Sequence, residues 1–193
     1  QQMIRNECVN DGTIESGGEV RNSDLLQTYL EGAGLDIETY EPTPGRRSMV
    51  ARIEGSDPDA PAVCLMGHTD VVPVSPEGWH QDPFGGELID GEVWGRGAVD
   101  MLCLTASMAV AYKHIAQSDT KPRGDLIYFG VADEEAGGEW GARWIADNEW
   151  DAIRCDYVLT EFGGFPTETA HGNAITINVA EKGLGWQRLH VKG

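Results

Sequence analysis

Basic residues are scarce in this sequence. Lys and Arg together number 14, against 32 Asp and Glu, which gives a formal net charge of −18 at pH 7. Because nucleic-acid phosphates are bound by basic surfaces, this balance argues against a nucleic acid as a partner. A metal site uses only a handful of carboxylates, so most of the surplus must lie on the surface, where adaptation to high salt is a second explanation.

Cysteines are few, and long apolar runs are missing. The cysteines are Cys8, Cys64, Cys103 and Cys155, with no CxxC pair among them. A structural zinc site and a disulfide framework are therefore not expected, and the cytoplasm is the default location. Cys64 and Cys103 lie in apolar patterns that predict buried thiols. No run approaches the length that crosses a membrane, and the N-terminus lacks a signal-peptide core, so no membrane partner is expected.

Strand and helix patterns alternate along most of the chain. Apolar residues make up 40% and charged residues 24%, which is typical of a globular protein. The predicted strands are Leu35–Thr39, Met49–Ile53, Ala62–Met66, Leu126–Val131 and Tyr157–Thr160. The alternation predicts an α/β fold with three layers, formed by a largely parallel central sheet and helices on both faces.

Three helices are predicted, one before these strands and two between them. The first is expected to begin at Asn22-Ser23-Asp24, whose side chains suit a helix N-cap. The second begins at Asp100 and has the clearest periodicity, and the third passes through Trp140 and Trp144. The face of the second helix that is predicted to be buried carries Met101, Leu104, Met108, Ala111, Tyr112 and Ile115.

The remaining segments carry turn and strand patterns. Glu87–Trp94 predicts a hairpin that turns on Asp90-Gly91. Ala174–Ala180 and Trp186–Val191 predict two further strands. The chain starts on Gln1–Arg5, which resembles the middle of a helix, and it stops just after a strand-like run. We therefore expect it to be a piece of a longer protein.

Polar residues gather immediately after the predicted buried strands. His68 and Asp70 follow one strand, Glu134 and Glu135 follow the next, and Glu161 follows the third. In open α/β sheets, functional sites form in the crevice beyond the carboxyl ends of the strands. These residues are therefore expected to converge in space although they are far apart in the sequence.

His68 and Asp70 are two residues apart on extended chain, so their side chains leave the same face. A carboxylate placed there can accept the imidazole N–H of His68 and fix which ring nitrogen faces a metal. Taken alone, His68 is better explained by a polar turn and Asp100 by an ordinary helix N-cap. Because the other strand ends also carry acids, a metal site is favoured, with Asp100 offering two carboxylate oxygens.

Glu134 and Glu135 are adjacent, so one carboxylate can bind a metal while the other acts as a general base. Such pairs are common on solvated surfaces, but this pair lies between a buried strand and Ala136-Gly137-Gly138, where backbone can approach closely. As ligands, Asp100, Glu135 and Glu161 bring three negative charges, and two divalent cations would balance these together with a bound hydroxide. Imidazole and carboxylate ligands suit zinc, with cobalt or manganese as substitutes.

Four segments of the sequence resemble, in order and spacing, the motifs of a known family. They are Met66-Gly67-His68-Thr69-Asp70-Val71-Val72-Pro73, Trp94-Gly95-Arg96-Gly97-Ala98-Val99-Asp100-Met101, Asp133-Glu134-Glu135 and Glu161-Phe162-Gly163-Gly164. Together they look like the successive motifs of the M20 metallopeptidases, which include acetylornithine deacetylase, succinyl-diaminopimelate desuccinylase, glutamate carboxypeptidase and several dipeptidases. The resemblance covers nearly the whole chain, and four ordered motifs are specific where each alone would be weak.

The resemblance implies a role for each candidate site residue. Four residues match metal ligands: His68 and Glu161 on one Zn²⁺, Glu135 on the other, and Asp100 bridging the two. A cis peptide bond is expected after Asp100. Glu134 matches the general base, and Asp70 matches the residue that orients His68.

The implied activity is zinc-dependent hydrolysis of the amide bond of small N-acyl amino acids or dipeptides, by a hydroxide that bridges the metals. The family's remaining His ligand and its lid domain are expected beyond Gly193, since His80, His114, His171 and His190 match no ligand. Residues 1–183 are thus interpreted as part of a di-zinc catalytic domain and 184–193 as the start of the lid, through which the full-length protein would form a homodimer. The alternative is a metal-binding fragment without turnover of its own.

Overall fold

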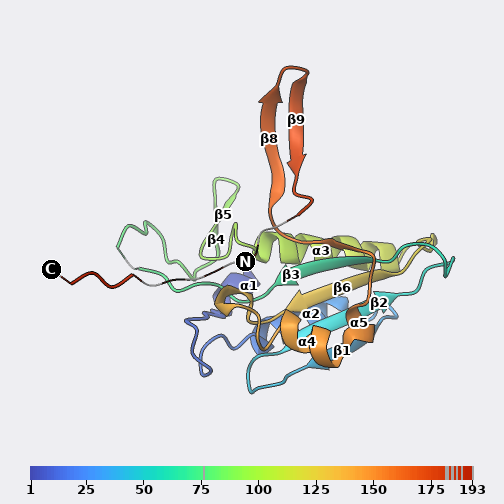
Figure 1. Ribbon diagram of the computed structural model, residues 1–193, viewed down its shortest axis with the longest axis horizontal. Helices are drawn as coiled ribbons and strands as arrows, with labels where there is room; N and C mark the ends of the chain where they lie inside the picture. The colour runs from blue at the N-terminus through green and yellow to red at the C-terminus, as the bar shows by residue number, and fades with distance from the viewer. Residues whose placement is uncertain (76, 181–182, 184, 186, 188, 193) are drawn as a thin grey trace. The chain divides into compact units, whose positions relative to one another are not determined.

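The computed structural model describes residues 1–75, 77–180, 183, 185, 187 and 189–192, and a five-stranded sheet forms its core (Figure 1). In spatial order the strands are β1 (Asp36–Tyr40), β2 (Ser48–Ile53), β6 (Leu126–Val131), β3 (Val63–His68) and β7 (Tyr157–Leu159). β3 pairs in parallel with β6 and β7, while β2 pairs antiparallel with β1 and β6. Four strands therefore run in one direction, with β2 reversed between them. The predicted α/β fold class is confirmed, in a sheet of mixed pairing.

Helices cover both faces of this sheet. They are α1 (Gln2–Arg5), α2 (Val20–Leu30), α3 (Leu102–Ala116), the 3₁₀ helix η1 (Glu134–Ala136), α4 (Ala142–Asn148) and α5 (Trp150–Ile153). Met49 and Tyr128 point to one face, where they pack with buried side chains of α2 and α3. Val50 and Ile127 point to the other face and pack with Ile145 of α4. Because successive strand residues alternate between faces, β1, β2, β3 and β6 each contribute to both apolar layers, whereas the residues of β7 are exposed.

The buried face of α3 is shifted by about one position along the sequence from the predicted face. Its buried residues are Leu102, Thr105, Ala109 and Tyr112. Thr105 turns inward because its hydroxyl donates a hydrogen bond to the carbonyl oxygen of His68 at 2.7 Å. Cys103 consequently lies on the exposed side, so the prediction of a buried thiol was wrong there, whereas Cys64 is buried as predicted. A polar anchor, rather than apolar periodicity, sets the orientation of this helix.

The three predicted helices are present, but each begins at a different residue from the predicted one. α2 already begins at Val20, and it buries Asn22 instead of using it as a cap; the Asn22 amide donates to the carbonyl of Thr69 at 2.8 Å. The N-cap of α3 is Met101 rather than Asp100, and the cis peptide bond implied by the resemblance joins these two residues. α4 begins at Ala142, so Trp140 precedes it.

Two hairpins complete the described structure. β4 (Glu87–Ile89) and β5 (Glu92–Trp94) form the predicted one, with positive φ at both Asp90 and Gly91, as a two-residue turn requires. The second pairs β8 (Gly163–Thr169) with β9 (Gly172–Ile177). β9 overlaps the predicted strand Ala174–Ala180. β8 was not predicted, because two glycines and a proline within it are typical of turns.

The chain divides into two compact units, Gln1–Glu161 and Phe162–Gly193. The domain boundary expected between residues 183 and 184 stays a prediction, because several residues around it lie outside the described part of the chain. The predicted strand Trp186–Val191 likewise falls partly outside the described residues. Among the helices that are described, none is long and apolar enough to cross a membrane.

Candidate metal centre

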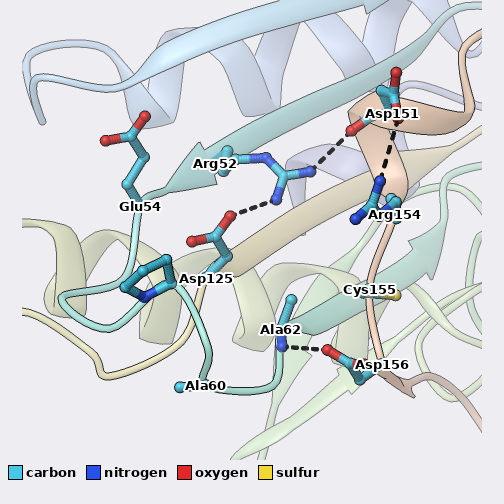
Figure 2. Close-up of a pocket in the computed structure, with 10 residues that line it drawn as sticks. Arg52, Glu54, Ala60, Ala62, Asp125, Asp151, Arg154, Cys155 and Asp156 are labelled. Atoms are coloured by element: carbon cyan, nitrogen blue, oxygen red, sulfur yellow. Dashed lines mark hydrogen bonds and ion pairs between the residues drawn. The ribbon is translucent and has the colours of Figure 1, made fainter.

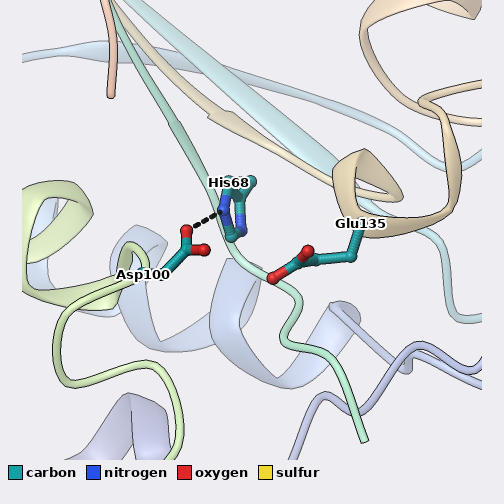
Figure 3. A group of neighbouring side chains, drawn as sticks. All are labelled: His68, Asp100 and Glu135. Carbon is teal, nitrogen blue, oxygen red and sulfur yellow. Dashed lines mark hydrogen bonds and ion pairs between the residues drawn. The ribbon is translucent and has the colours of Figure 1, made fainter. Parts of the chain in front are cut away.

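Three parallel strands end at the same edge of the sheet, and each is followed by predicted site residues. His68 is the last residue of β3, Glu134 and Glu135 lie in η1 shortly after β6, and Glu161 comes two residues after β7. Asp100 arrives from another element, the segment before α3 (Figure 3). The structure therefore brings these five side chains to one place from four separate stretches of sequence.

The Nε2 atom of His68 lies at the centre of this cluster. It is 3.1 Å from Oδ1 of Asp100, 3.6 Å from Oε2 of Glu161 and 3.7 Å from Oε2 of Glu134. Glu135 extends toward the same place (Figure 3). Two sets of three residues can each present ligand atoms within 4.8 Å of one another: His68 with Asp100 and Glu135, and His68 with Glu134 and Glu161. Both sets depend on His68.

Burial decreases from the imidazole outward. The side chain of His68 is 1% exposed, that of Glu161 is 20% exposed and that of Asp100 is 63% exposed. The ring thus forms the floor of the cluster, and the carboxylates form its open side. A cation can approach the carboxylates from solvent and still reach a buried, fixed nitrogen.

Hydrogen bonding determines which nitrogen of His68 faces the carboxylates. Nδ1 lies 2.9 Å from the main-chain carbonyl oxygen of Asp70, which can only accept, so Nδ1 carries a proton. In the neutral ring, Nε2 then presents its lone pair to carboxylate oxygens, which also only accept. A proton or a cation between them satisfies both sides. A ring nitrogen fixed in this way by a carbonyl on its far side is the usual arrangement of a metal-binding histidine.

The crowding of acids changes their proton affinity. Burial and the surrounding negative charges raise the pKa of Glu135 from 4.5 to about 7. Burial and the charge of Glu134 raise the pKa of Glu161 to about 7. Burial alone would lower the pKa of His68, but the negative charges around it outweigh that effect and raise it. The cluster therefore retains protons near neutral pH that a divalent cation would displace.

Asp70 contacts His68 differently from the expectation. Its carbonyl oxygen makes the short contact with the imidazole, while its carboxylate Oδ1 lies 3.6 Å from Nδ1. The carboxylate instead accepts hydrogen bonds from the main-chain N–H groups of Glu134 and Glu135, at 3.2 and 3.1 Å. Asp70 thus joins the end of β3 to the turn that carries the two glutamates.

Comparison with known proteins supplies the family. The sequence pattern described as "Peptidase family M20/M25/M40" matches residues 64–183, well over half of the chain. The chain belongs to this family. The matched segment contains all of the predicted site residues: His68, Asp70, Asp100, Glu134, Glu135 and Glu161. The resemblance inferred from the four motifs is confirmed.

Relatives of this M20 chain are considerably longer than it is. Aminoacylase-1 of Sus scrofa is 34% identical over 172 residues, covering 88% of this chain and 41% of that protein. Succinyl-diaminopimelate desuccinylase of Cereibacter sphaeroides is 35% identical over 156 residues, covering 80% and 39%. An M20 family metallo-carboxypeptidase from Sulfolobus solfataricus shares the fold, with a TM-score of 0.64 at 22% identity, covering 84% of this chain and 36% of that chain. The chain spans about two fifths of the length of these relatives.

The other histidines lie apart from the cluster. His80, His114, His171 and His190 are all exposed. Within the described residues, His68 is the histidine that belongs to a set able to hold a metal.

A pocket of about 410 Å³ lies at the opposite edge of the sheet, where β3, β6 and β7 begin (Figure 2). Several of its polar groups are already paired with one another. Arg52 donates to the carboxylate of Asp125 at 2.7 Å and to the carbonyl of Asp151 at 3.0 Å, and Asp156 accepts from the N–H of Ala62 at 2.8 Å. These contacts tie strand ends together, so we assign the pocket a structural role.

Four buried polar residues behind the candidate ligands were assigned no role from the sequence. They are Asn10, Glu19, Arg46 and Asp133, each at most 3% exposed. Asp133 belongs to one of the four motifs, directly before the glutamate pair, but no role was predicted for it. Nothing local marks the other three, because their partners lie far away in the sequence.

In this M20 chain, the raised pKa values predict how stability depends on pH without metal. Glu135 and Glu161 bind protons more tightly when folded than when unfolded, so they stabilise the fold most below about pH 4.5 and lose this contribution as the pH rises through about 7. With a chelator present, the unfolding temperature is expected to fall between pH 5 and pH 8. Added Zn²⁺ should remove this decline. Thermal melts would check both expectations. In Glu161→Gln the decline should be shallower. An unfolding temperature that increases with pH in the metal-free protein would contradict the prediction.

Proposed function

We propose that this M20 chain carries the metal-binding and proton-transfer residues of an amide hydrolase that uses two zinc ions. One observation carries the proposal. A buried imidazole nitrogen and four carboxylates converge at the carboxyl ends of three parallel strands. His68 has one nitrogen free and would hold one ion, so carboxylates would have to hold the other. A structural explanation of five such residues would require several acids to be crowded together without compensation, which is costly.

The donor atoms fit divalent cations. His68, Asp100, Glu135 and Glu161 would hold them, since imidazole and carboxylate ligands suit zinc and also accept cobalt or manganese. The fit is supported by the lone pair of Nε2, which faces only acceptors, and by the raised pKa values of Glu135 and Glu161. When bound, such cations polarise an amide carbonyl and lower the pKa of water to about 7.

Glu134 is proposed as the general base and acid. Its main-chain N–H is held by Asp70, while its side chain is 45% exposed and therefore lies on the open side of the cluster, where water and substrate arrive. A carboxylate there can accept a proton from water and pass it to the leaving amine, a role that contributes about 10²- to 10⁴-fold to rate. The adjacent Glu135 points inward to the metal set.

For the full-length protein, we propose hydrolysis of small N-acyl amino acids or dipeptides. The names of the relatives support this class, because aminoacylase-1 and succinyl-diaminopimelate desuccinylase both denote removal of an acyl group from an amine. A cytoplasmic location is proposed because all four cysteines are free. The lid domain, and a homodimer formed through it, belong to the same proposal.

Metal removal tests this function directly. In the full-length protein, hydrolysis of N-acetyl amino acids and dipeptides is expected to disappear after dialysis against a chelator and to return with Zn²⁺, Co²⁺ or Mn²⁺. Release of the free amino acid would be followed chromatographically, and bound metal by elemental analysis. Activity that survives with metal below a tenth of an equivalent would overturn the proposal.

A second candidate is a metal-binding unit that does not turn over by itself. It is favoured by the dependence of both ligand sets on His68, which leaves a second ion with fewer protein ligands in the described residues. Metal-dependent hydrolysis by the isolated 193-residue chain would exclude this candidate. Metal binding without hydrolysis, combined with activity of the full-length protein, would support it.

A further inference from the structure

A buried polar network lies directly behind the proposed metal site. Its members are Asn10, Glu19, Arg46, Asp70 and Asp133, each at most 3% exposed. They include one positive and three negative side chains. Burying charges in this way usually costs stability compared with apolar residues of similar size. In the described residues, Glu19 Oε2 and Arg46 Nε have no hydrogen-bond partner, so the network is not optimised for stability. Its position suggests another role.

Asn10 is the residue that bridges this network. Its Oδ1 accepts from Nη2 of Arg46 and from the N–H of Gly12, both at 3.1 Å. Its Nδ2 donates to Oδ2 of Asp70 at 2.8 Å and to Oδ1 of Asp133 at 3.1 Å. Donors surround one end of the amide and carboxylates surround the other. The orientation of the amide is thereby fixed, because a flip would set donor against donor and acceptor against acceptor.

The two carboxylates that Asn10 joins hold the same turn at two points. Asp133 begins the turn in a left-handed conformation, with φ of 65°. Its N–H donates to Glu19 at 3.1 Å, and its other carboxylate oxygen accepts from the N–H of Trp140 at 2.9 Å. Asp70 accepts from the next two N–H groups, those of Glu134 and Glu135. The backbone of the general base and of a proposed ligand is therefore fixed by side chains that themselves meet at Asn10.

We propose that Asn10 is a positioning residue that sets metal affinity, by holding Asp70 and Asp133 so that the Glu134–Glu135 turn faces His68. Within the described residues, Asn10 makes no hydrogen bond to the side chain of a proposed metal ligand. It acts through two carboxylates, one on each side of the glutamate pair. The metal part of this inference rests on the proposed function, whereas the clamp on the turn rests on the hydrogen bonds alone.

Asn10→Ala tests the proposal, with Leu30→Ala as a control of stability. Leu30 is the last residue of α2, and its side chain is fully buried in the apolar layer between α2 and the sheet. Its truncation therefore destabilises the fold without touching the network. Asn10→Ala is expected to weaken Zn²⁺ binding about 10- to 100-fold, the usual effect of losing a group that orients ligands. It should also change the visible absorption spectrum of the Co²⁺-loaded protein. Leu30→Ala should lower the unfolding temperature and leave affinity and spectrum unchanged.

Amide hydrogen exchange provides a measurement that needs no metal, and its first part needs no variant. In the unsubstituted metal-free chain, the N–H groups of Glu134 and Glu135 are expected to exchange slowly although they lie in a turn. In folded Asn10→Ala both amides should exchange at least tenfold faster than in the unsubstituted chain. In Leu30→Ala their exchange should speed up no more than that of the amides in the sheet. Rapid exchange of both amides in the unsubstituted chain would overturn the clamp.

Failure of this inference and failure of the proposed function give different results. If the unsubstituted chain binds no Zn²⁺, the proposed function of the chain fails, and the exchange of the Glu134 and Glu135 amides still decides whether the turn is clamped. If Zn²⁺ binds, a folded Asn10→Ala variant with unchanged affinity, Co²⁺ spectrum and amide exchange would overturn the role of Asn10. Equal loss of affinity in Leu30→Ala would overturn it as well, because the effect would then be one of general stability.

Discussion

Glu134→Gln is expected to leave metal binding in the full-length protein nearly unchanged and to lower kcat by about 10²- to 10⁴-fold. Glutamine keeps the size of the side chain and leaves the main-chain N–H on Asp70, so the turn should retain its conformation. What is lost is the carboxylate that would accept a proton from water. Turnover of an N-acetyl amino acid and metal content per chain, measured on the same preparation, would check the two halves of this expectation.

The neighbouring Glu135→Gln is the matched control. It makes the same chemical change one residue away, in a side chain that forms a set with His68 and Asp100. This variant is expected to lose metal affinity first, and activity as a consequence. Glu134 also lies within reach of His68 and Glu161, so the two glutamates have to be distinguished by experiment. Loss of metal from Glu134→Gln, with retention by Glu135→Gln, would show that their roles are exchanged.

Local sequence patterns predicted those parts of the fold that local physics determines. The strands β2, β3 and β6 follow from short apolar runs, and their positions were predicted to within two residues at each end. The hairpin β4–β5 follows from Asp90-Gly91, which tolerate the positive φ of a tight turn. β8 was missed because glycine and proline are typical of turns, and only pairing with β9 makes that segment a strand.

The candidate ligands could be proposed for the same reason, since each lies at or close to the end of a strand, or just before a helix. Their supporting contacts were not. The face of α3 is set by one hydroxyl of Thr105 on the carbonyl of His68, which apolar periodicity cannot reveal. Asn10 reaches Asp70 across 60 residues and Asp133 across 123, and no spacing rule connects them. Sequence patterns therefore point to candidate ligands more readily than to the groups that hold those ligands in place.

His68→Gln is expected to weaken Zn²⁺ binding more than any other single substitution in the chain. Both sets of prospective ligands contain His68, whereas Asp100 and Glu161 each belong to one. Changes to residues that only orient ligands cost about 10- to 100-fold in affinity, so removal of a shared ligand should cost more than about 100-fold. Glutamine fills most of the volume of this buried side chain, which limits the effect on packing.

The zinc-induced rise in unfolding temperature measures this effect in the folded protein. At a free Zn²⁺ concentration about 100 times its Kd, ligand binding stabilises the fold by about 2.7 kcal/mol, which corresponds to a rise of roughly 5–10 °C for a chain of this size. His68→Gln should show no rise at that concentration, while Asp100→Asn and Glu161→Gln should retain part of it. His114→Gln, an exposed position on α3, should behave as the unsubstituted chain does. A full zinc-induced rise in the unfolding temperature of His68→Gln would mean that the imidazole does not bind the metal. His68 would then no longer count as a ligand in either set.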